Sequence, residues 1–473
     1  MIFNSIEFLI FLPLFMIVYF ATKRNLRLTV CLVGSYIFYG WWDWKFLGLI
    51  LLTTVVAFVV GMQMSKRESA RARKGLLLVS LVISLGVLGV YKYFDFFIGS
   101  LQEALGSMGM AVPEWELRLI LPVGISFYTF QTLSYTIDVY RRQLDVECNF
   151  IRFAAYVAFF PQLVAGPIVR ASTLLPQLRE DRRPSWNCIV VGLQLILLGF
   201  FKKVVVADSA APIVDSIFRN PELFTSLNVI LGVYLYAVQI YCDFSGYSDI
   251  AIGIGRLLGF DFGKNFDKPY FSSSFSEFWR RWHISLSSWL RDYLYISLGG
   301  NRKGTFRTYV NLMLTMLLGG LWHGAAWTFV VWGALHGAYL VGQRLLGAPF
   351  GKATAWAPKW MVKVFLVALV FHLTCLAWIF FRAEGFGNAM EILGRIASLD
   401  NFSPGALKQI FELGTVLALS AVLIGCEWVG FVTPAREFVA KRPALLVLWC
   451  ALILWAIALF GNYSGNSFIY FQF

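Results

Sequence analysis

The chain has few charged residues and no long polar segment. Asp, Glu, Lys and Arg make up only 14% of its 473 residues, whereas about a quarter of an average soluble domain is charged. Apolar runs recur instead from one end to the other, and they exclude the series of soluble domains that this length would otherwise suggest. We therefore expect one membrane domain over residues 1–473.

Motifs for metal, disulfide or nucleotide chemistry are also missing. The seven cysteines are scattered and form no Cys-x-x-Cys pair, so we expect neither a zinc site nor a disulfide framework. Gly253, Gly255 and Gly259 give G-x-G-x-x-x-G with no strand before it, which is not the dinucleotide fingerprint. No Walker motif or G-x-S-x-G elbow is present, and no internal repeat supports a two-fold repeated transporter. We expect no metal and no permanently bound cofactor.

Basic residues exceed acidic ones and lie in short clusters. The formal net charge is +13, which in a soluble protein would suggest nucleic acid as a partner. Here the clusters separate apolar runs, as the positive-inside bias of a multi-spanning protein requires. The 17% aromatic content also fits, because Trp and Tyr favour the membrane interface. We expect membrane lipid around the chain and no nucleic-acid partner.

A membrane-spanning helix needs about 20 apolar residues. Suitable stretches lie at roughly 2–20, 28–42, 46–64, 75–98, 119–139, 187–207, 227–256, 309–345, 361–381, 411–431 and 444–461. The stretch 309–345 is long enough for two short spans. We predict an all-α polytopic protein with about ten to twelve membrane helices.

The basic clusters also predict the orientation. Two predicted spans separate the cluster at 23–27 from that at 66–74, and two more separate the latter from 141–142. These clusters therefore share one face, the cytoplasmic one. The N-terminal run lacks the basic region and cleavage site of a signal peptide, so we expect an uncleaved first span. Both termini are expected on the opposite, outer face.

Two segments do not fit simple spans. Residues 150–170 are apolar, yet basic residues flank both ends, and Pro161 and Gly166 interrupt the run. This segment is either re-entrant, lining a cavity that opens towards the cytoplasm, or a short kinked span. Residues 260–308 are too polar to span, and we expect helices at the cytoplasmic interface or dipping into the protein. Ser276 and Glu277 can start one of them.

The chain has only four histidines, and His323 lies in the apolar run LLGGLWHGAAWTF. An ionisable group at that depth is costly and indicates function, although a packed core histidine is the alternative. The flanking glycines allow another group to approach closely. On a continuous helix His336 would point about 140° away from His323. We expect His336 and His372 to be structural.

His283 lies in EFWRRWHISLSSWLRDY, where a helix would place Arg280 and Ser287 on its face. Such a polar, cationic face could hold a phosphate-bearing donor, or it could contact lipid head groups. Asp243 and Tyr247, in YCDFSGYSDIAIGIG, would share another helix face. They either line a polar tunnel or satisfy buried backbone groups nearby.

Several of these runs together resemble a known family. FWRRWHISLSSWLRDYLYISLGGNRKG and LLGGLWHGAAWTFVVWGALHG look like the membrane-bound O-acyltransferase family, and FFPQLVAGPIVR, YCDFSGYSDIAIG and LPVGISFYTFQTLSY also match. The resemblance is strongest to the bacterial subgroup for O-acetylation of alginate and similar polysaccharides. It extends nearly end to end, with the core motifs over about 120–345.

The resemblance implies a ring of helices around a central tunnel that joins the two membrane faces. It implies that His323 is the family's near-invariant membrane histidine and that His283 is its second, upstream polar position. Similar proteins take acetyl from a cytoplasmic donor, acetyl-CoA, and pass it to a periplasmic partner that acetylates a polysaccharide. We therefore expect an O-acyltransferase with His323 as base or polarising group and His283 as its partner.

The remaining candidate residues follow from charge and position. Those expected to hold the donor at the cytoplasmic mouth are Trp279, Arg280, Arg281, Asn301, Arg302 and Lys303. Those expected to line the tunnel are Asp243, Ser245, Tyr247, Pro161 and Gly166.

Other functions remain open at this point. One is transfer of D-alanyl or another acyl group on the same fold, although LGGNRKG fits the acetylation subgroup better. Another is a transporter of a polysaccharide or solute. This alternative is supported by the intramembrane Asp243 and Asp249 and by the break at Pro161. A third is a non-catalytic scaffold of an export complex.

Overall fold

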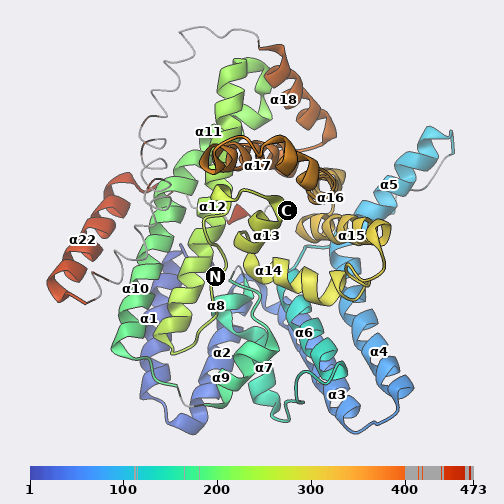
Figure 1. Ribbon diagram of the computed structural model, residues 1–473. Helices are drawn as coiled ribbons and strands as arrows, with labels where there is room; N and C mark the ends of the chain where they lie inside the picture. The colour runs from blue at the N-terminus through green and yellow to red at the C-terminus, as the bar shows by residue number, and fades with distance from the viewer. Residues whose placement is uncertain are drawn as a thin grey trace. The chain divides into compact units, whose positions relative to one another are not determined.

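The structure is a computed structural model, and it describes residues 1–110, 113, 115–164, 166–180, 182–399, 414, 418, 425, 438, 441–463 and 468–469 (Figure 1). Over these ranges the regular structure is entirely helical, which confirms the predicted all-α class. Contacts divide the chain into two compact units, Met1–Ile189 with Ile254–Gly263, and Val190–Gly253 with Lys264–Phe473. The two units are described separately, and the single domain over residues 1–473 stays a prediction.

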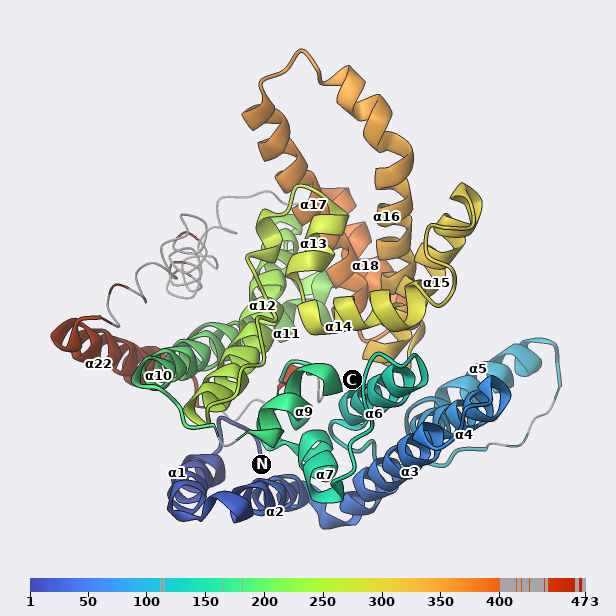
Figure 2. The ribbon, with the colours of Figure 1, turned by 60° about the horizontal axis from the view of Figure 1, so that its bottom comes forward.

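The first unit contains the N-terminal helices. They are α1 (Ile6–Ala21), α2 (Arg24–Asp43), η1 (Trp44–Phe46), α3 (Leu47–Ser65), α4 (Ala70–Leu88), η2 (Gly89–Tyr93), α5 (Phe94–Ser107), α6 (Ile125–Tyr140), α7 (Phe150–Ala158), α8 (Phe160–Leu163) and α9 (Ala171–Arg179). Helices α3, α4 and α6 pack against one another, and α2 packs along α7 (Figure 2). Almost all of α6 is buried, although it carries many Ser and Thr side chains, because these hydroxyls bond within the protein.

The predicted break in residues 150–170 is present. Helix α7 ends at Ala158, the short α8 follows, and α9 begins only at Ala171. Pro161 lies in the first turn of α8, where its missing N–H costs least. The side chain of Gln162 donates to the backbone oxygen of Tyr156 (2.7 Å), which satisfies one group that the break exposes. Phe159 and Phe160 are fully buried.

The two ends of this broken segment meet. Glu147, just before α7, accepts from Arg152 at 2.8 Å and from Arg179, at the end of α9, at 3.1 Å. A segment that starts and ends at one buried carboxylate has the geometry of a re-entrant loop rather than of a straight span.

The second unit contains the remaining helices. They are α10 (Trp186–Phe200), η3 (Phe201–Ala207), α11 (Asp208–Arg219), η4 (Pro221–Leu223), α12 (Ser226–Leu257), η5 (Pro269–Phe271), α13 (Phe275–Arg281), α14 (Ile284–Trp289), η6 (Leu290–Tyr295), α15 (Thr305–His323), α16 (Trp327–Ala353), α17 (Lys359–Arg382), α18 (Phe386–Ser398) and α22 (Pro443–Phe460). Helices α10 and α12 run side by side (Figures 1 and 2), and Gly199 contacts the backbone of Gly246.

Residues 260–308 form short helices, as expected, but their boundaries differ from the prediction. The helix before His283 is capped by Ser274, whose side chain accepts from the Glu277 amide, and not by Ser276. Glu277 in turn accepts from the amide and hydroxyl of Ser273 and pairs with Arg281 at 2.7 Å. Burial opposes ionisation, but the hydrogen bonds from Ser273 and the charge of Arg281 lower the pKa of Glu277 overall.

The stretch 309–345 holds two helices, as its length suggested. Helix α15 ends at His323 and α16 begins at Trp327. Glycines let the two backbones touch, because a Cβ on Gly320 would lie 2.2 Å from the Phe329 oxygen and one on Gly333 2.4 Å from the Met316 oxygen. This pair of helices presents His323 at their junction.

In the described part of the chain, six helical runs are long and apolar enough to cross a membrane. They cover Arg24–Ser65, Ala70–Ser107, Trp186–Arg219, Ser226–Leu257, Lys359–Arg382 and Pro443–Phe460. The shorter α1 is apolar as well. The predicted span at 411–431 lies almost wholly outside the described residues. The count of about ten to twelve spans stays a prediction.

Candidate active site

His323 is enclosed by aromatic rings of the second unit. Its side chain is buried, with the residue 4% exposed. The ring centroids of Trp322, Trp332 and Phe381 lie 5.0, 4.9 and 5.2 Å from that of His323, all nearly perpendicular to it. The next residue is Gly324, and any Cβ there would lie 2.1 Å from the Phe329 ring. The predicted close approach at the glycines is therefore made by α16 itself.

His283 occupies a break between two helices, which corrects the prediction of a continuous helix. Its φ is +42°, a left-handed conformation, and it separates α13 from α14. The cause is tertiary. The backbone amide of Ile284 donates to the backbone oxygen of Asn265, and the backbone amide of Asp267 donates to the backbone oxygen of Arg281, each at 2.9 Å. These bonds pull the chain into a turn that a non-glycine residue adopts only under constraint.

The hydrogen bonds of Asn265 fix the tautomer of His283. The Asn265 amide nitrogen donates to Ser248 (2.9 Å), so its oxygen is the acceptor that faces His283 Nδ1 at 3.2 Å and also receives the Ser285 hydroxyl. His283 Nδ1 therefore carries the proton, and Nε2 has the lone pair. Within the described residues Nε2 is buried and has no hydrogen-bond partner. Burial lowers the pKa of His283 to about 3, so the ring is neutral at physiological pH.

The two predicted catalytic histidines belong to one aromatic cluster. Trp322 contacts both, with its ring centroid 5.0 Å from His323 and 5.9 Å from His283. Phe244 of α12 packs edge-on against His283 at 4.6 Å. Residues separated by about forty positions in the sequence thus meet on a single tryptophan.

His336 lies nearer to His323 than the sequence predicted. The prediction assumed one continuous helix, but the chain reverses between α15 and α16, so that Trp332 contacts both rings at 4.9 and 4.7 Å. His336 is fully buried, and in the described structure neither ring nitrogen has a hydrogen-bond partner. His372 is exposed and its Nδ1 lies 2.7 Å from the Ala368 oxygen.

The predicted donor-binding residues fall into two groups. Trp279 turns inward, with its ring 5.1 Å from His336 and 5.8 Å from Trp332. Arg280 is exposed, whereas Arg281 is held by Glu277. The other three, Asn301, Arg302 and Lys303, are exposed in the glycine-rich turn before α15. No contact between the two groups is recorded among the described residues.

The predicted tunnel residues of α12 are buried in an ion cluster. Asp243 pairs with Lys203 at 2.8 Å and accepts from the Ile469 amide at 2.7 Å. Lys203 also pairs with Asp208 at 2.7 Å. Tyr247 stacks on Phe468 at 4.3 Å, and Ser245 is 1% exposed. Asp243 is thus satisfied by a lysine and by a backbone amide near the C-terminus.

Asp249 is also paired, with Lys202 at 3.1 Å. The pairing of both carboxylates leaves only the break at Pro161 in support of a transporter. The other two predicted tunnel residues, Pro161 and Gly166, are buried in the broken segment of the first unit.

Sequence reasoning missed Asn265, Trp322 and Trp332. Asn265 carried no signal, because it lies eighteen residues before His283 in an irregular segment. Trp322 and Trp332 lie within the quoted motif, but no role was assigned to them. Also missed was a basic pocket in the first unit, which contains none of the predicted donor residues.

Comparison with known proteins identifies the family of this sequence. The model of the membrane-bound O-acyltransferase family matches residues 36–382. A probable alginate O-acetylase AlgI of Azotobacter vinelandii is 44% identical over 89% of this chain and 84% of its own length. One from Pseudomonas putida is 38% identical over the full length of both chains. A peptidoglycan O-acetyltransferase of Helicobacter pylori is 34% identical over 85% of this chain and 81% of its own. The chain therefore belongs to the membrane-bound O-acyltransferase family and is a multi-pass membrane O-acyltransferase.

Proposed function

We propose that the protein transfers acetyl groups from cytoplasmic acetyl-CoA towards a polysaccharide outside the bacterial inner membrane, with His323 as the catalytic base. The observation that carries this proposal is the pair of buried imidazoles, His323 and His283, on the shared ring of Trp322. The names of the relatives from Azotobacter vinelandii and Helicobacter pylori support O-acetylation of a polysaccharide.

The chemistry requires a neutral imidazole and little water. In the proposed step a hydroxyl oxygen of the acceptor attacks the thioester carbonyl carbon while His323 takes the hydroxyl proton. The carbon–sulfur bond then breaks, and the proton passes to the departing thiolate, which leaves as coenzyme A. The surrounding aromatic rings exclude water, which strengthens these electrostatic interactions.

His283 supports this step as a second neutral imidazole. Asn265 holds the Nδ1 proton, which leaves the Nε2 lone pair directed away from Asn265. In our proposal Nε2 accepts a hydrogen bond from the incoming hydroxyl or from a relaying water molecule. Asn265 acts as a positioning residue, because it joins His283 and Ser285 to Ser248 of α12 and orients the imidazole.

Substrate access is the demanding part of the mechanism. His323 retains only 4% exposure, so an acetyl unit reaches it when a neighbouring aromatic ring rotates. The proposal places the donor at the cytoplasmic mouth of a central tunnel, near Trp279, Arg280 and the turn containing Arg302. It places the acceptor, a sugar or a relay protein, on the periplasmic side, where we also expect both termini.

The proposal is tested by His323→Ala, with His372→Ala as the matched control, because His372 is exposed and its ring contacts Tyr234 and Phe371 rather than the rings around His323. We expect His323→Ala to lower transfer from labelled acetyl-CoA by about 10²–10⁴-fold, the contribution of a general base. His372→Ala should retain parental activity. Membranes with equal amounts of each protein are compared, and labelled D-alanyl carrier protein serves as the alternative donor.

Two outcomes would contradict the proposal. Parental acetylation by a well-inserted His323→Ala protein would remove the histidine from the chemistry. Transfer from the D-alanyl carrier and not from acetyl-CoA would change the acyl group.

A further inference from the structure

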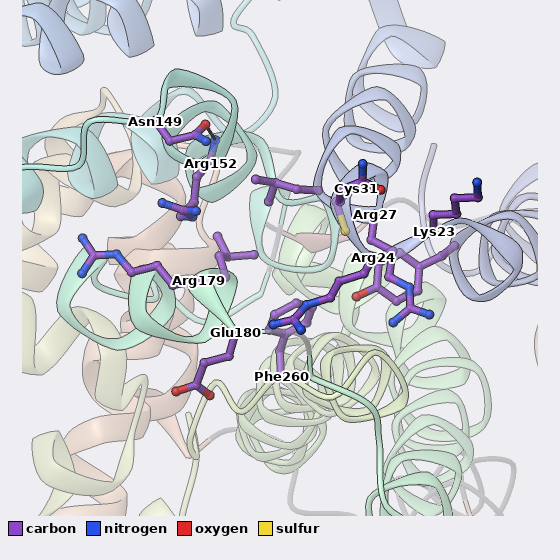
Figure 3. A pocket seen from close by; sticks show the side chains of 13 residues that line it. Lys23, Arg24, Arg27, Cys31, Asn149, Arg152, Arg179, Glu180 and Phe260 are labelled. Carbon is purple, nitrogen blue, oxygen red and sulfur yellow. Dashed lines mark hydrogen bonds between the residues drawn. The ribbon is translucent and has the colours of Figure 1, made fainter.

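The first unit contains a pocket of about 510 Å³ (Figure 3). It lies among the end of α1, the first turns of α2, the start of α7 and the end of α9. Its lining residues are Tyr19, Lys23, Arg24, Asn25, Arg27, Leu28, Cys31, Asn149, Arg152, Leu178, Arg179, Glu180 and Phe260. The proposed acetyl transfer uses none of them.

Positive charge dominates this pocket. Five of its lining residues are Lys or Arg, and only Glu180 is acidic. That carboxylate is itself bridged to Arg182 at 2.9 Å. Figure 3 shows the basic side chains of α2 on one side of the space and those of α7 and α9 on the other. Arginine forks on opposite walls suit an oxyanion such as phosphate.

The framework holds two of these arginines in place. Buried Glu147 accepts from Arg152 at 2.8 Å and from Arg179 at 3.1 Å, one guanidinium on each of its oxygens. Arg152 still has a buried Nε without a hydrogen-bond partner in the described residues. Across the pocket Arg27 is 7% exposed and donates through its Nε to the Thr22 oxygen. The charges are therefore pre-positioned rather than spread over a flexible surface.

Helix ends add to the positive potential. Helix α2 begins at Arg24 and α7 at Phe150, and residues of both first turns line the pocket. The N-terminal end of a helix carries partial positive charge and attracts phosphate groups.

The surroundings indicate a lipid as the source of the phosphate. Helix α1, which ends at the pocket, exposes an apolar face that includes Leu14, Ile17 and Val18 at 58%, 65% and 52%. Such a face lies against acyl chains in a membrane. Tyr19, Leu28 and Phe260 give the pocket an apolar floor beside its charges. It also lies on the side that the basic clusters assign to the cytoplasmic leaflet, where anionic lipids attract Lys and Arg.

We propose that this pocket binds the phosphate head group of an anionic membrane lipid, with the acyl chains along α1. The basic side chains of α2 and Lys23 face the phosphate from one side, and Arg152 and Arg179, held by Glu147, face it from the other. The apolar side chains receive the glycerol backbone.

The experiment uses purified protein in a non-ionic detergent and soluble dihexanoyl phosphatidylglycerol as the probe, with binding measured by titration calorimetry. The test variant is Lys23→Gln/Arg24→Gln, because both residues are exposed on the pocket rim. We expect its affinity to fall at least about tenfold, the effect of losing two charge-assisted contacts. The control is Lys66→Gln/Arg67→Gln, an exposed basic pair beyond α3, which should bind like the parent.

Three further probes distinguish the sources of phosphate. Dihexanoyl phosphatidylcholine should bind more weakly than the phosphatidylglycerol, because its choline cation meets the basic wall. Inorganic phosphate that binds as tightly as phosphatidylglycerol would overturn the lipid assignment. Coenzyme A binding that Lys23→Gln/Arg24→Gln weakens would make this a donor site and also overturn it. Equal affinity of the parent and Lys23→Gln/Arg24→Gln for phosphatidylglycerol would show that this pocket is not the lipid site. That result would be independent of the activity of His323→Ala.

Discussion

At the residue scale, burial decides the properties of His283. The ring is 0% exposed and packs against Phe244, Trp322 and the amide of Asn265. A protonated imidazole would be costly there, and this burial lowers its pKa to about 3. The same site holds a strained backbone conformation, φ +42°. Strain and a buried base at one position are typical of functional sites.

This burial predicts a pH dependence of stability. Between pH 6.5 and about 3 the unfolded chain protonates His283 but the folded protein does not. The contribution of neutral His283 to the free energy of unfolding is therefore complete above pH 6.5. It falls as the pH is lowered, by up to about 1.4 kcal/mol per pH unit. The thermal unfolding midpoint of the solubilised protein should fall less between pH 7 and 5 for His283→Gln than for the parent. His372→Gln, at an exposed position, should keep the parental slope. Parallel slopes for the parent and His283→Gln would refute this assignment.

The sequence pointed to His283 and His323 but not to their environment. His323 stood out as an ionisable residue in an apolar run, and the resemblance to the family implied a role for both histidines. Asn265 could not be found, since its role depends on a tertiary turn that joins residues 265–267 to 281–284. The pairing of Asp243 with Lys203 and with the Ile469 amide was likewise hidden, because each contact is long-range.

At the element scale, the contact between α15 and α16 depends on glycine. Gly320 and Gly333 bring the two backbones within a distance that no side chain permits. Because His323 ends α15 and Trp332 lies in α16, this contact sets the position of the His323 ring relative to the Trp332 ring.

A methyl group at this contact should therefore affect both stability and activity. In Gly333→Ala the new Cβ would lie 2.4 Å from the Met316 backbone oxygen, so the helices must separate. We expect a loss of about 1–3 kcal/mol in unfolding free energy, as for other overpacked cores, and reduced acetyl transfer. Gly342→Ala is the matched control in the same helix, since nothing lies within 4 Å of its Cβ. That change should gain about 0.5–1 kcal/mol. Equal unfolding midpoints for the two variants would contradict this account.

Helix positions followed well from hydropathy, and helix breaks did not. The stretches at 46–64 and 361–381 correspond closely to α3 and α17. A continuous helix through His283 was wrong, because the turn is imposed by hydrogen bonds from a distant segment. The break at Pro161 was foreseen, because proline acts on its own backbone and needs no distant partner.

At the scale of the whole molecule, charge asymmetry predicts topology. The turn between α3 and α4 carries basic residues, whereas the end of α5 carries Glu103 and few cations. The run from Ala70 to Ser107 is long and apolar enough to cross the bilayer between them. The orientation itself stays a prediction, which rests on loop charge and not on packing.

Cysteine labelling tests this orientation. Glu68 and Glu103 are both exposed. We expect a membrane-impermeant maleimide added to sealed spheroplasts to label Glu103→Cys and not Glu68→Cys. Both should react after the membrane is opened. The parent chain, with its own exposed Cys148, gives the background. Labelling of Glu68→Cys alone in sealed cells would reverse the predicted topology.

The bond between Asp243 and the Ile469 amide has a consequence for biosynthesis. The two partners are 226 residues apart, and a bacterial ribosome needs roughly ten to forty-five seconds for that length. Throughout this interval Asp243 can pair with Lys203 of η3, but its second carboxylate oxygen lacks the backbone donor. This part of the second unit therefore completes its hydrogen bonding only after residue 469 has been added, which makes its final packing a late step of synthesis.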